Sequence, residues 1–370
     1  MAPVVQSKVP KGWQRVKLGD ISDITNGKAN TQDAVAGGEY PLFDRSVSIK
    51  RSDKYLFDKA AVILPGEGAE FIPRYYSGKF DLHQRVYAIF PCDEVHPPYL
   101  FQYLYANRAV FAQNAVGSTV KSLRLPIIQK VPVLLPPHKE QEKIAEILVA
   151  VDEEIQKTDE IIAATEKLKR GLMQDILSFK NKTSVKYLAL GDIGKVSMCK
   201  RVFKEETSDT GEIPFYKIGT FGKEPDAFIS QELFDSYRKK FSFPKMGDVL
   251  LSASGTIGRK VKYDGKPAYF QDSNIIWLDH DESKVLNNFL FYLYDTITWQ
   301  TEGSTIKRLY NNILLKKVIP VPSINEQKQI AEIFSVVDEK ILINQKLKDK
   351  LTFIKKGLMW DLLTGKKRTV

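Results

Sequence analysis

The chain has little cysteine and no long hydrophobic run, and both absences limit what it can be. Its 370 residues include only two cysteines, Cys92 and Cys199, far apart and outside any Cys-x-x-Cys pattern. No stretch of about 18 apolar residues is present, and the N-terminus lacks the apolar core of a signal peptide. We therefore expect a cytoplasmic protein that does not associate with membranes and has no disulfide framework.

The sequence also lacks the short motifs that mark common enzyme classes. It contains no Walker A loop, no Gly-x-Gly-x-x-Gly and no His-Glu-x-x-His. Its four histidines, His83, His96, His138 and His280, do not have the spacing of metal ligands. We predict that this chain has no catalytic residue, no metal site and no cofactor of its own.

Basic residues exceed acidic ones, and the excess is spread along the chain. The sequence has 55 Lys and Arg against 45 Asp and Glu, which gives a net charge of +10 and a pI near 9.2. Residues 1–200 carry 28 basic and 23 acidic side chains, and residues 201–370 carry 27 and 22. An even excess favours a polyanionic partner, without separating DNA from RNA or acidic lipid.

An internal repeat dominates the sequence. Glu140–Ile155 (EQEKIAEILVAVDEEI) and Glu326–Ile341 (EQKQIAEIFSVVDEKI) are identical at 10 of 16 positions, at an offset of 186. Leu18–Ile21 recurs as Leu190–Ile193 at an offset of 172, so the variable part is 14 residues longer in the second copy. The chain is therefore expected to alternate a variable globule with a repeated segment, twice.

Both repeated segments are predicted to be long helices. Ser323, three residues before Glu326, forms a capping box, and Pro136 and Pro137 mark the start of the first helix. Apolar residues then recur in steps of three and four over about five heptads, which is typical of a coiled-coil seam. The simplest partner for each helix is the other one. The residues that define these helices are Glu140, Gln141, Ile144, Leu148, Val151 and Ile155 in the first and Glu326, Gln327, Ile330, Phe334, Val337 and Ile341 in the second.

Two further pairs of positions repeat within the helices. Thr158 and Asn344 interrupt the apolar stripe, either as buried polar residues that fix the register or as exposed breaks. Gly171 and Gly357 lie inside otherwise good helical sequence, where each costs about 1 kcal/mol relative to Ala. The repetition of these glycines favours the close approach of another backbone.

The expected helices have the length of a spacer between two globules. About 40 helical residues make a rod of roughly 60 Å, and an antiparallel pair would carry the preceding globules to opposite ends. One turn of B-DNA is roughly 34 Å, so such a rod could hold two DNA-binding globules one or more turns apart. This arrangement would suit a split DNA site with an unread gap.

With these features the sequence resembles a known family, the specificity subunits of type I restriction-modification systems. The resemblance includes the proline-then-Glu-Gln opening of both repeats, the Leu-Gly-Asp-Ile start of both halves, and the Gly-Thr-Ile-Gly element at Gly255–Gly258. The first half departs from this last element, having Gly66, Glu67, Gly68 and Ala69 at the comparable place.

The resemblance implies an α+β fold with two mixed α/β target-recognition domains, separated by two long antiparallel helices that form a coiled coil with an internal pseudo-two-fold repeat. The expected boundaries are 1–135 and 181–321 for the recognition domains and 136–180 and 322–370 for the spacer helices.

The resemblance also implies partners. The chain would bind double-stranded DNA and two modification (methyltransferase) subunits that use S-adenosylmethionine, and restriction subunits that use ATP and Mg would complete the complex. It would work in the cytoplasm of a bacterium or archaeon, associated with the nucleoid, and would supply sequence choice without catalysis.

DNA recognition needs cations for phosphates and planar donors for base edges. We expect Arg85 and Arg259 to be the foremost base contacts. The candidate DNA-binding residues are Arg45, Arg51, Arg74, Lys79, Gln84, Arg85, Lys121 and Arg124 in the first globule and Lys200, Arg201, Lys217, Arg238, Ser254, Thr256, Arg259 and Lys260 in the second.

Two other functions remain open from the residues alone. Asp226 after Pro225, with Asp264 and Lys266, loosely matches the acidic constellation of a metal-dependent nuclease that would bind Mg²⁺. A coiled-coil scaffold that binds protein and not DNA is the second alternative. The nuclease predicts cleavage of duplex DNA by the lone protein with Mg²⁺, and the scaffold predicts no salt-sensitive DNA affinity.

Overall fold

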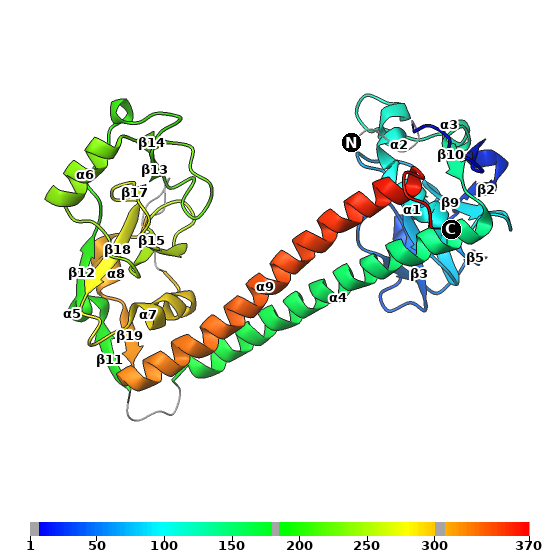
Figure 1. The fold of residues 1–370 in the computed structure, drawn as a ribbon. Helices are drawn as coiled ribbons and strands as arrows, with labels where there is room; N and C mark the ends of the chain where they lie inside the picture. The colour runs from blue at the N-terminus through cyan, green and yellow to red at the C-terminus, as the bar shows by residue number, and fades with distance from the viewer. Residues whose placement is uncertain (1–6, 180–184, 300–307, 370) are drawn as a thin grey trace. The chain divides into compact units, whose positions relative to one another are not determined.

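A computed structural model describes residues 7–179, 185–299 and 308–369 (Figure 1). The chain divides into two compact units: unit 1 is Met1–Ile161 with Asn344–Val370, and unit 2 is Ile162–Ile343. The helix α4 (His138–Ile176) starts in unit 1, and α9 (Ile324–Leu363) starts in unit 2. Each unit therefore contains one globule, the beginning of its own long helix and the end of the other.

Unit 1 is built on two four-stranded sheets and a two-stranded ribbon. The first sheet is antiparallel, in the order β2 (Ser22–Asn26), β9 (Val86–Pro91), β6 (Ala61–Pro65) and β7 (Arg74–Tyr76). The second has the order β4 (Lys50–Ser52), β3 (Tyr40–Phe43), β8 (Lys79–Leu82) and β5 (Phe57–Asp58), with β3 and β8 parallel. The ribbon pairs β1 (Gln14–Lys17) with β10 (Pro132–Leu135). The helical segments are η2 (Leu18–Asp20), η3 (Thr31–Asp33), α1 (Pro97–Ala106), α2 (Arg108–Asn114) and α3 (Leu125–Gln129).

Unit 2 repeats this plan. Its antiparallel sheet has the order β12 (Gly194–Ser197), β18 (Ile275–His280), β15 (Val249–Ser252) and β16 (Lys260–Lys262). Its second sheet has the order β14 (Phe228–Ile229), β13 (Ile213–Tyr216) and β17 (Tyr269–Phe270), with β13 and β17 parallel. The ribbon pairs β11 (Lys186–Ala189) with β19 (Val318–Val321). The helical segments are α5 (Leu190–Ile193), η4 (Lys204–Glu206), α6 (Gln231–Lys240), α7 (Asn287–Leu293), η5 (Tyr294–Thr296) and α8 (Asn311–Leu315).

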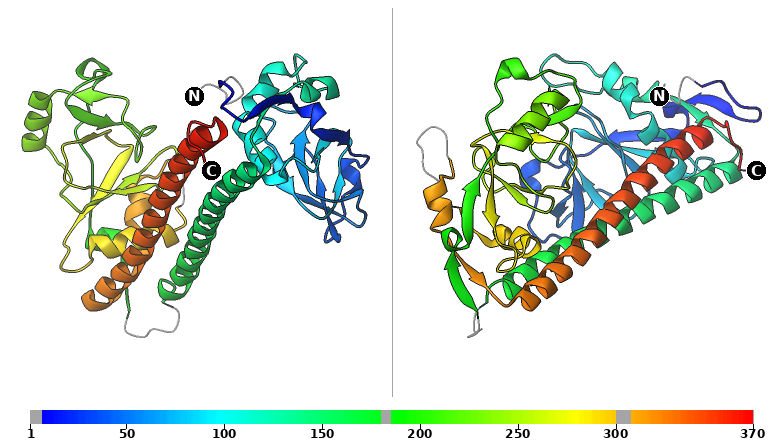
Figure 2. Two further views of the ribbon diagram at one scale, coloured as in Figure 1. Left: turned by 45° about the vertical axis from the view of Figure 1, so that its right-hand side comes forward. Right: turned by 60° about the vertical axis from the view of Figure 1, so that its left-hand side comes forward.

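The extra length of the second copy lies mostly at α6. Strand β14 is followed by α6, whereas its counterpart β4 is followed by the short strand β5. Ser230 caps α6, because its Oγ accepts a hydrogen bond from the Leu233 amide. In Figures 1 and 2, α6 lies at the periphery of unit 2. The variable parts therefore differ by an added helix on a shared scaffold.

A buried central strand in each unit separates two layers of core. In β6, Val62 and Leu64 face the helices, while Ala61 and Ile63 face the second sheet. Strand β15 alternates in the same way, with Leu251 facing the helices and Leu250 facing the other sheet. Such continuous apolar strands are expected where both faces of a sheet are covered.

The long helices contribute to both cores. Ile144 and Leu148 of α4 are buried in unit 1 with Met359 and Leu362 of α9. In unit 2 the equivalent residues of α9, Ile330 and Phe334, are buried, and the end of α4 packs against them. The next seam positions, Val151 and Ile155 in α4 and Val337 and Ile341 in α9, are partly buried. The first turns of each helix thus belong to its own globule.

The direction of the helices follows from their ion pairs. In unit 1, Lys348 binds Asp159 and Lys355 binds Asp152. A later residue of α9 is thus paired with an earlier residue of α4, which means that the two helices are antiparallel. In unit 2, Lys169 of α4 binds Asp338 of α9. The predicted fold class is confirmed: two mixed α/β globules, an internal repeat and two long antiparallel helices.

One expectation for these helices is wrong. A Cβ atom added at Gly171 or Gly357 would meet no atom within 4 Å, so neither glycine permits a close backbone contact within the described residues. Thr158 is buried, and its Oγ1 donates to the Glu154 carbonyl within its own helix. The Thr158 hydroxyl is therefore satisfied locally, as is usual for threonine inside a helix.

Candidate nucleic-acid interface

Three loops of unit 1 meet at one edge of its sheets. Because β3 and β8 are parallel neighbours, the loops that follow them leave from the same edge. The His83 amide donates to the Phe43 carbonyl (2.9 Å), and the Gly66 amide donates to the Arg85 carbonyl (2.9 Å). We call this group of loops loop cluster 1; it consists of residues 44–49, 66–73 and 83–85.

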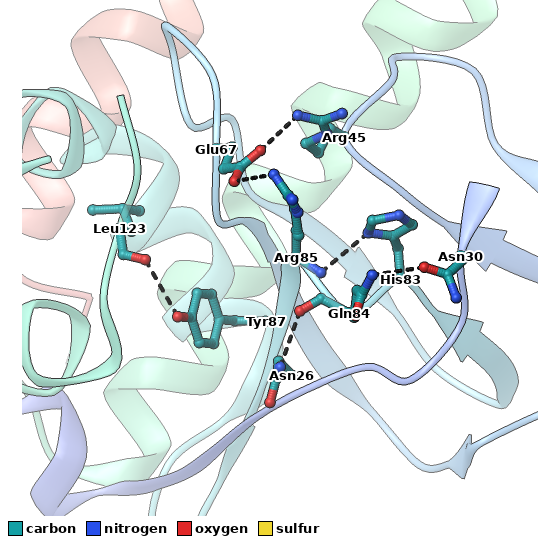
Figure 3. Close-up of polar contacts among 9 residues, drawn as sticks. All are labelled: Asn26, Asn30, Arg45, Glu67, His83, Gln84, Arg85, Tyr87 and Leu123. Carbon is teal, nitrogen blue, oxygen red and sulfur yellow. Dashed lines mark hydrogen bonds and ion pairs between the residues drawn. The ribbon is translucent and has the colours of Figure 1, made fainter. Parts of the chain in front are cut away.

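Loop cluster 1 brings together two of the predicted arginines through an acidic residue. Arg45 Nη1 lies 2.6 Å from Glu67 Oε2, and Arg85 Nη1 lies 2.7 Å from Glu67 Oε1. Figure 3 shows both guanidinium groups pointing at this carboxylate. The Glu67 side chain is 16% exposed, whereas the arginines are 47% and 56% exposed. In the sequence, Glu67 lies in the segment of the first half that is comparable to the Gly-Thr-Ile-Gly element, and the sequence alone gives it no role.

The same edge carries an amide and a histidine. Gln84 Nε2 donates to Asn30 Oδ1 (2.6 Å), and the Gln84 carbonyl accepts from Asn26 Nδ2 (2.9 Å) (Figure 3). His83 Nδ1 accepts a hydrogen bond from the Arg85 amide. Burial first, and then the charge of Arg45, lower the pKa of His83, so its ring is neutral at pH 7. His83 thus supports the loop and does not act as a cation.

Four other predicted residues of unit 1 differ in their positions. Arg74 reaches the edge, because its Nη2 donates to the Ser46 carbonyl. Lys121 and Arg124 flank Leu123, whose amide donates to the Gly66 carbonyl, so both adjoin loop cluster 1. Arg51 does not reach it, since its guanidinium binds the Gly38 and Glu39 carbonyls near the start of β3.

Lys79 also lies away from this edge. It begins β8, whereas loop cluster 1 follows the end of that strand, and its Nζ lies 4.8 Å from the centre of the Tyr55 ring.

The equivalent edge of unit 2 has the same backbone contacts. The Gln271 amide donates to the Tyr216 carbonyl (3.0 Å), and the Ala253 amide donates to the Asn274 carbonyl (2.8 Å). We call residues 217–220, 253–259 and 271–274 loop cluster 2. The Gly-Thr-Ile-Gly element lies in the β15–β16 loop, which is the topological equivalent of the β6–β7 loop that contains Glu67 in unit 1. The comparison of these two segments in the sequence therefore placed them correctly.

In loop cluster 2 a Ser–Asn hydrogen bond takes the place of the Glu67–Arg85 ion pair of loop cluster 1. Ser254 is buried and its Oγ donates to Asn274 Oδ1 (2.7 Å). Arg308 Nη2 donates to the same oxygen (3.2 Å) and to the Ser273 carbonyl. Arg308 and Asn274 were not predicted from the sequence. Their position depends on pairings between distant segments, and no local pattern marks it.

Three of the predicted cations at or near loop cluster 2 each form a hydrogen bond or an ion pair within the protein. Arg259 donates to the Phe221 carbonyl (3.0 Å) and to Thr256 Oγ1 (3.3 Å). Arg201 binds Asp272 at 3.0 Å, and Lys217 binds Asp226 at 2.9 Å. Arg201 and Lys217 keep large exposed surfaces. They can therefore still meet a polyanion.

The remaining predicted cations of unit 2 lie against aromatic rings. Lys200 and Arg238 pack near Phe241 and Phe243 beside α6. Lys260 is only 10% exposed and its Nζ pairs with Asp295 at 2.6 Å. Burial lowers the pKa of Lys260 to about 8 despite this pairing. The expectation that Lys260 contacts DNA is therefore wrong, because its buried ammonium group is paired with Asp295.

The repeated glutamine of each long helix has the same structural role in both units. Gln141 Oε1 accepts from the His96 amide, and its Nε2 donates to the Glu94 and Pro136 carbonyls (2.8, 3.1 and 2.9 Å). Gln327 repeats this set with the Leu286 amide and the Lys284 and Pro322 carbonyls (2.8, 3.0 and 3.0 Å). Each glutamine thus joins the loop before α1 or α7 to the start of a long helix.

The repeated glutamate differs between the units. Glu140 is fully buried and accepts hydrogen bonds from Trp13 Nε1 (3.0 Å) and from Arg368 Nε and Nη2 (2.6 and 2.8 Å). Glu326 forms the predicted capping box with Ser323, accepting from its amide and hydroxyl (3.1 and 2.9 Å). Arg368 therefore joins the segment after α9 to the first turn of α4.

An aspartate on each long helix forms a second repeated contact. Asp152 accepts from Gln102 Nε2 of α1 (2.7 Å) and pairs with Lys355. Asp338 lies at the equivalent position and pairs with Lys169 at 2.6 Å, and the Lys169 Nζ lies 5.6 Å from the ring of Tyr292 in α7. Burial first, and then the charge of Asp338, raise the pKa of Tyr292. Each aspartate thus joins its own globule to the opposite helix.

The residues of the nuclease alternative are engaged in other contacts. Asp226 pairs with Lys217, and Asp264 pairs with Lys266. Across residues 7–179, 185–299 and 308–369, no three His, Cys, Asp or Glu side chains are placed to hold a metal ion together. None of the helices in these segments has the length and apolar character needed to span a membrane.

Together, these features define a duplicated protein whose two units present different polar side chains on equivalent loops. The family model for the type I restriction-modification DNA specificity domain matches residues 10–166 and 183–352. Because these two matches cover most of the chain, the protein belongs to this family. Membership agrees with the predicted specificity subunit that has no catalytic role of its own.

Known relatives extend over much of the chain. A Haemophilus influenzae protein assigned as a type I restriction enzyme specificity subunit is 36% identical over 331 residues, 85% of each chain. The specificity subunit of the Escherichia coli type I enzyme EcoDI is 31% identical over 172 residues, 46% of this chain and 38% of its own. The crystal structure of the Mycoplasma genitalium S subunit matches with a TM-score of 0.73 at 19% identity, covering 98% of this chain and 99% of the other. This last likeness concerns the fold alone.

Proposed function

We propose that the protein recognises a bipartite site on double-stranded DNA, with loop cluster 1 binding one half-site and loop cluster 2 the other. The observation that carries this proposal is that equivalent edges of two equivalent units present different sets of donors and acceptors. A shared scaffold with different side chains at its binding edge can address two different base sequences. A continuous helix of 39 residues is roughly 60 Å long, which is compatible with an unread gap between the half-sites.

The proposed DNA contacts are of two kinds. Arg45, Gln84, Arg85 and Arg259 carry planar groups that can form paired hydrogen bonds with base edges. The other exposed cations would bind phosphates, which gives affinity without sequence choice. These phosphate-binding residues are Arg74, Lys121 and Arg124 in or beside loop cluster 1, Lys217 in loop cluster 2, Arg201, which contacts Asp272 of that cluster, and its neighbour Lys200.

Two methyltransferase subunits would dock on the long helices. Ile161 and Leu168 of α4 are 43% and 56% exposed, and the residues 186 positions later, Leu347 and Ile354 of α9, are 44% and 40% exposed. A spacing of seven places each pair on one helix face, outside the seam residues. Since this apolar stripe is itself duplicated, it suits two copies of one partner related by pseudo-two-fold symmetry.

The chemistry of the complex would belong to these partners. The methyltransferase subunits would bind S-adenosylmethionine, and restriction subunits with ATP and Mg would complete the assembly. The chain itself would need no cofactor, and it would act in the cytoplasm, at the DNA of a bacterium or archaeon.

Methylome sequencing tests the assignment of half-sites. In a host that carries the chain and its methyltransferase, Arg85→Ala should relax the choice of base in one half of the methylated motif. Arg259→Ala should relax the other half. Each substitution should cost about 1 to 3 kcal/mol against the wild-type site. Motifs that stay unchanged in both variants would remove these arginines from the interface.

Mass measurement of the reconstituted complex tests the docking proposal. Two methyltransferase subunits per chain are expected at saturation, and Leu168→Glu combined with Ile354→Glu should lower that number. A complex that saturates with one methyltransferase subunit would contradict the symmetric scheme.

A further inference from the structure

Glu67 is a carboxylate in a loop cluster that is otherwise suited to bind a polyanion. Its position is set by the backbone, because a Cβ on the preceding Gly66 would lie 2.6 Å from the Arg85 carbonyl oxygen, and Gly68 has φ +139°. Any residue with a Cβ atom, at Gly66 because of this contact or at Gly68 because of its φ angle, would therefore strain or move the loop. A negative charge facing DNA repels phosphates, so Glu67 must contribute something other than affinity.

The geometry of the ion pairs suggests what that contribution is. Arg45 and Arg85 each use a single nitrogen, Nη1, on Glu67. Among the described residues, no other side-chain nitrogen of these two arginines makes a hydrogen bond to protein within 3.5 Å. A guanidinium group has five N–H donors, so each arginine keeps a donor edge for a partner. Both side chains are also about half exposed, as given above, so that edge can be reached.

We propose that Glu67 is a positioning residue for DNA specificity: it holds Arg45 and Arg85 side by side so that they address base edges and not phosphates. An arginine without this partner would move to the nearest phosphate, which carries no sequence information. Paired donors of arginine match O6 and N7 of guanine, so the half-site bound by unit 1 contains guanine. This inference rests on the DNA-recognition function proposed above.

Unit 2 limits the proposal to one half-site. Ser254 occupies the position of Glu67, and Asn274 occupies that of Arg85, as the equivalent backbone bonds from Gly66 and Ala253 show. In unit 2 the contact between these loops is the neutral Ser254–Asn274 hydrogen bond. In unit 1 it is the Arg85–Glu67 ion pair, and Arg45 of the β3–β4 loop adds a second ion pair to Glu67. A change at Glu67 should therefore alter only the half-site that unit 1 binds.

The test uses Glu67→Gln in the full chain, assembled with its methyltransferase. Binding is measured to a duplex with the wild-type site and to one in which the half-site of unit 1 is scrambled. Because the neutral amide of this variant cannot form ion pairs with the two arginines, they become available to phosphates. We expect tighter binding to the scrambled duplex by several fold and about tenfold lower discrimination between the two duplexes. The methylated motif should relax in that half-site alone.

Two matched variants separate charge and folding from positioning. Asp23→Asn removes an exposed carboxylate on β2, so it changes the net charge equally and should leave discrimination intact. Arg85→Ala should lower discrimination without tightening binding to the scrambled duplex. The unchanged second half-site reports that the variant chain is folded.

Other results would overturn the proposal. Equal weakening on both duplexes would give Glu67 a purely structural role. Lower discrimination without tighter binding to the scrambled duplex would mean that Glu67 contacts a base itself. If the wild-type complex did not distinguish the two duplexes, the proposed function would fail, whatever the variants did.

Discussion

The two units share their scaffold and differ in the side chains on their loops. Gln141 and Gln327 make the same three hydrogen bonds, and Asp152 and Asp338 each join a globule to the opposite helix. The contact between the β6–β7 and β8–β9 loops is the Glu67–Arg85 ion pair in unit 1, whereas its counterpart in unit 2 is a neutral Ser–Asn hydrogen bond.

This difference indicates which residues are free to vary. Side chains that hold the globule to the helices are needed for folding in each unit, so duplication has kept them equal. The charged side chains on loop cluster 1 that differ from their counterparts, such as Arg45 and Arg85, are about half exposed, so a change there disturbs the core less than a change at a buried contact. We therefore attribute the different loop side chains to the binding partner of each unit, and the identical globule-to-helix contacts to the requirements of the shared fold.

Glu140 and Glu326 break this pattern, and they give the largest expected effect. Glu140→Ala would leave Arg368 and Trp13 without their buried acceptor. Removing one member of a buried ion pair usually costs about 3 kcal/mol or more. We expect a value near this lower end for Glu140→Ala, because the remaining partner, Arg368, is 35% exposed to solvent. Glu326→Ala should cost about 1 kcal/mol, as expected for a lost capping interaction. Hydrogen exchange followed in peptides of each unit would measure both.

The difference should depend on pH. Burial alone would raise the pKa of Glu140, but hydrogen bonds from Arg368 and Trp13 outweigh it and leave the pKa below its ordinary value of 4.5. The stabilisation is therefore complete above pH 4.5 and is lost as the pH falls through the lowered pKa. An effect of Glu140→Ala that stayed constant from pH 7 to pH 3 would contradict this account.

The two glutamines should give equal effects, which sharpens the comparison. Gln141→Ala or Gln327→Ala removes three hydrogen bonds and leaves a backbone amide without its acceptor, at a cost of about 2 kcal/mol for each unit. Gln345→Ala on the exposed face of α9 is the control and should have almost no effect. Urea unfolding of each variant would provide the values. If only one of the two substitutions lowered the free energy of unfolding strongly, the two glutamines would have the same geometry but different contributions to stability.

The repeat in the sequence was enough to predict the two long helices and their pairing with each other, whereas the antiparallel arrangement and the mixed α/β globules were expected from the family resemblance. Glu140–Ile155 and Glu326–Ile341 are long, amphipathic and duplicated, and such patterns depend on neighbours within one helix. The role of Gln141 could not be predicted, because two of its three partners, Glu94 and His96, lie more than 40 residues earlier. Contacts of this kind depend on the tertiary fold.

The loop clusters were predictable as sets and not as individual contacts. Arg45 and Arg85 were expected to bind DNA, but nothing in the sequence indicated that Glu67 would join them. Lys260 was grouped with the exposed cations, although the fold buries it beside Asp295. Repetition of Gly171 and Gly357 suggested backbone contact, but the structure leaves open space there. Residue type and spacing do not determine which way a side chain faces.

The smallest expected effect concerns the ion pairs between the long helices. Lys355 pairs with Asp152 and lies 4.9 Å from the Tyr105 ring, while Lys169 pairs with Asp338 and lies 5.6 Å from the Tyr292 ring. Each aspartate is about one third exposed, so solvent screens the pair and we expect a coupling energy of about 1 kcal/mol. Double-mutant cycles with Asp→Asn and Lys→Met at each site would measure it.

An exposed pair on α4, Lys143 with Glu146, serves as the reference for these cycles. Its coupling should stay below about 0.5 kcal/mol, because both side chains are solvated and belong to one helix. If Asp152–Lys355 and Asp338–Lys169 coupled no more strongly than this reference, the aspartates would not join the globules to the opposite helices energetically. The alignment of each globule on the helices would then depend on the buried apolar residues and the two glutamines alone.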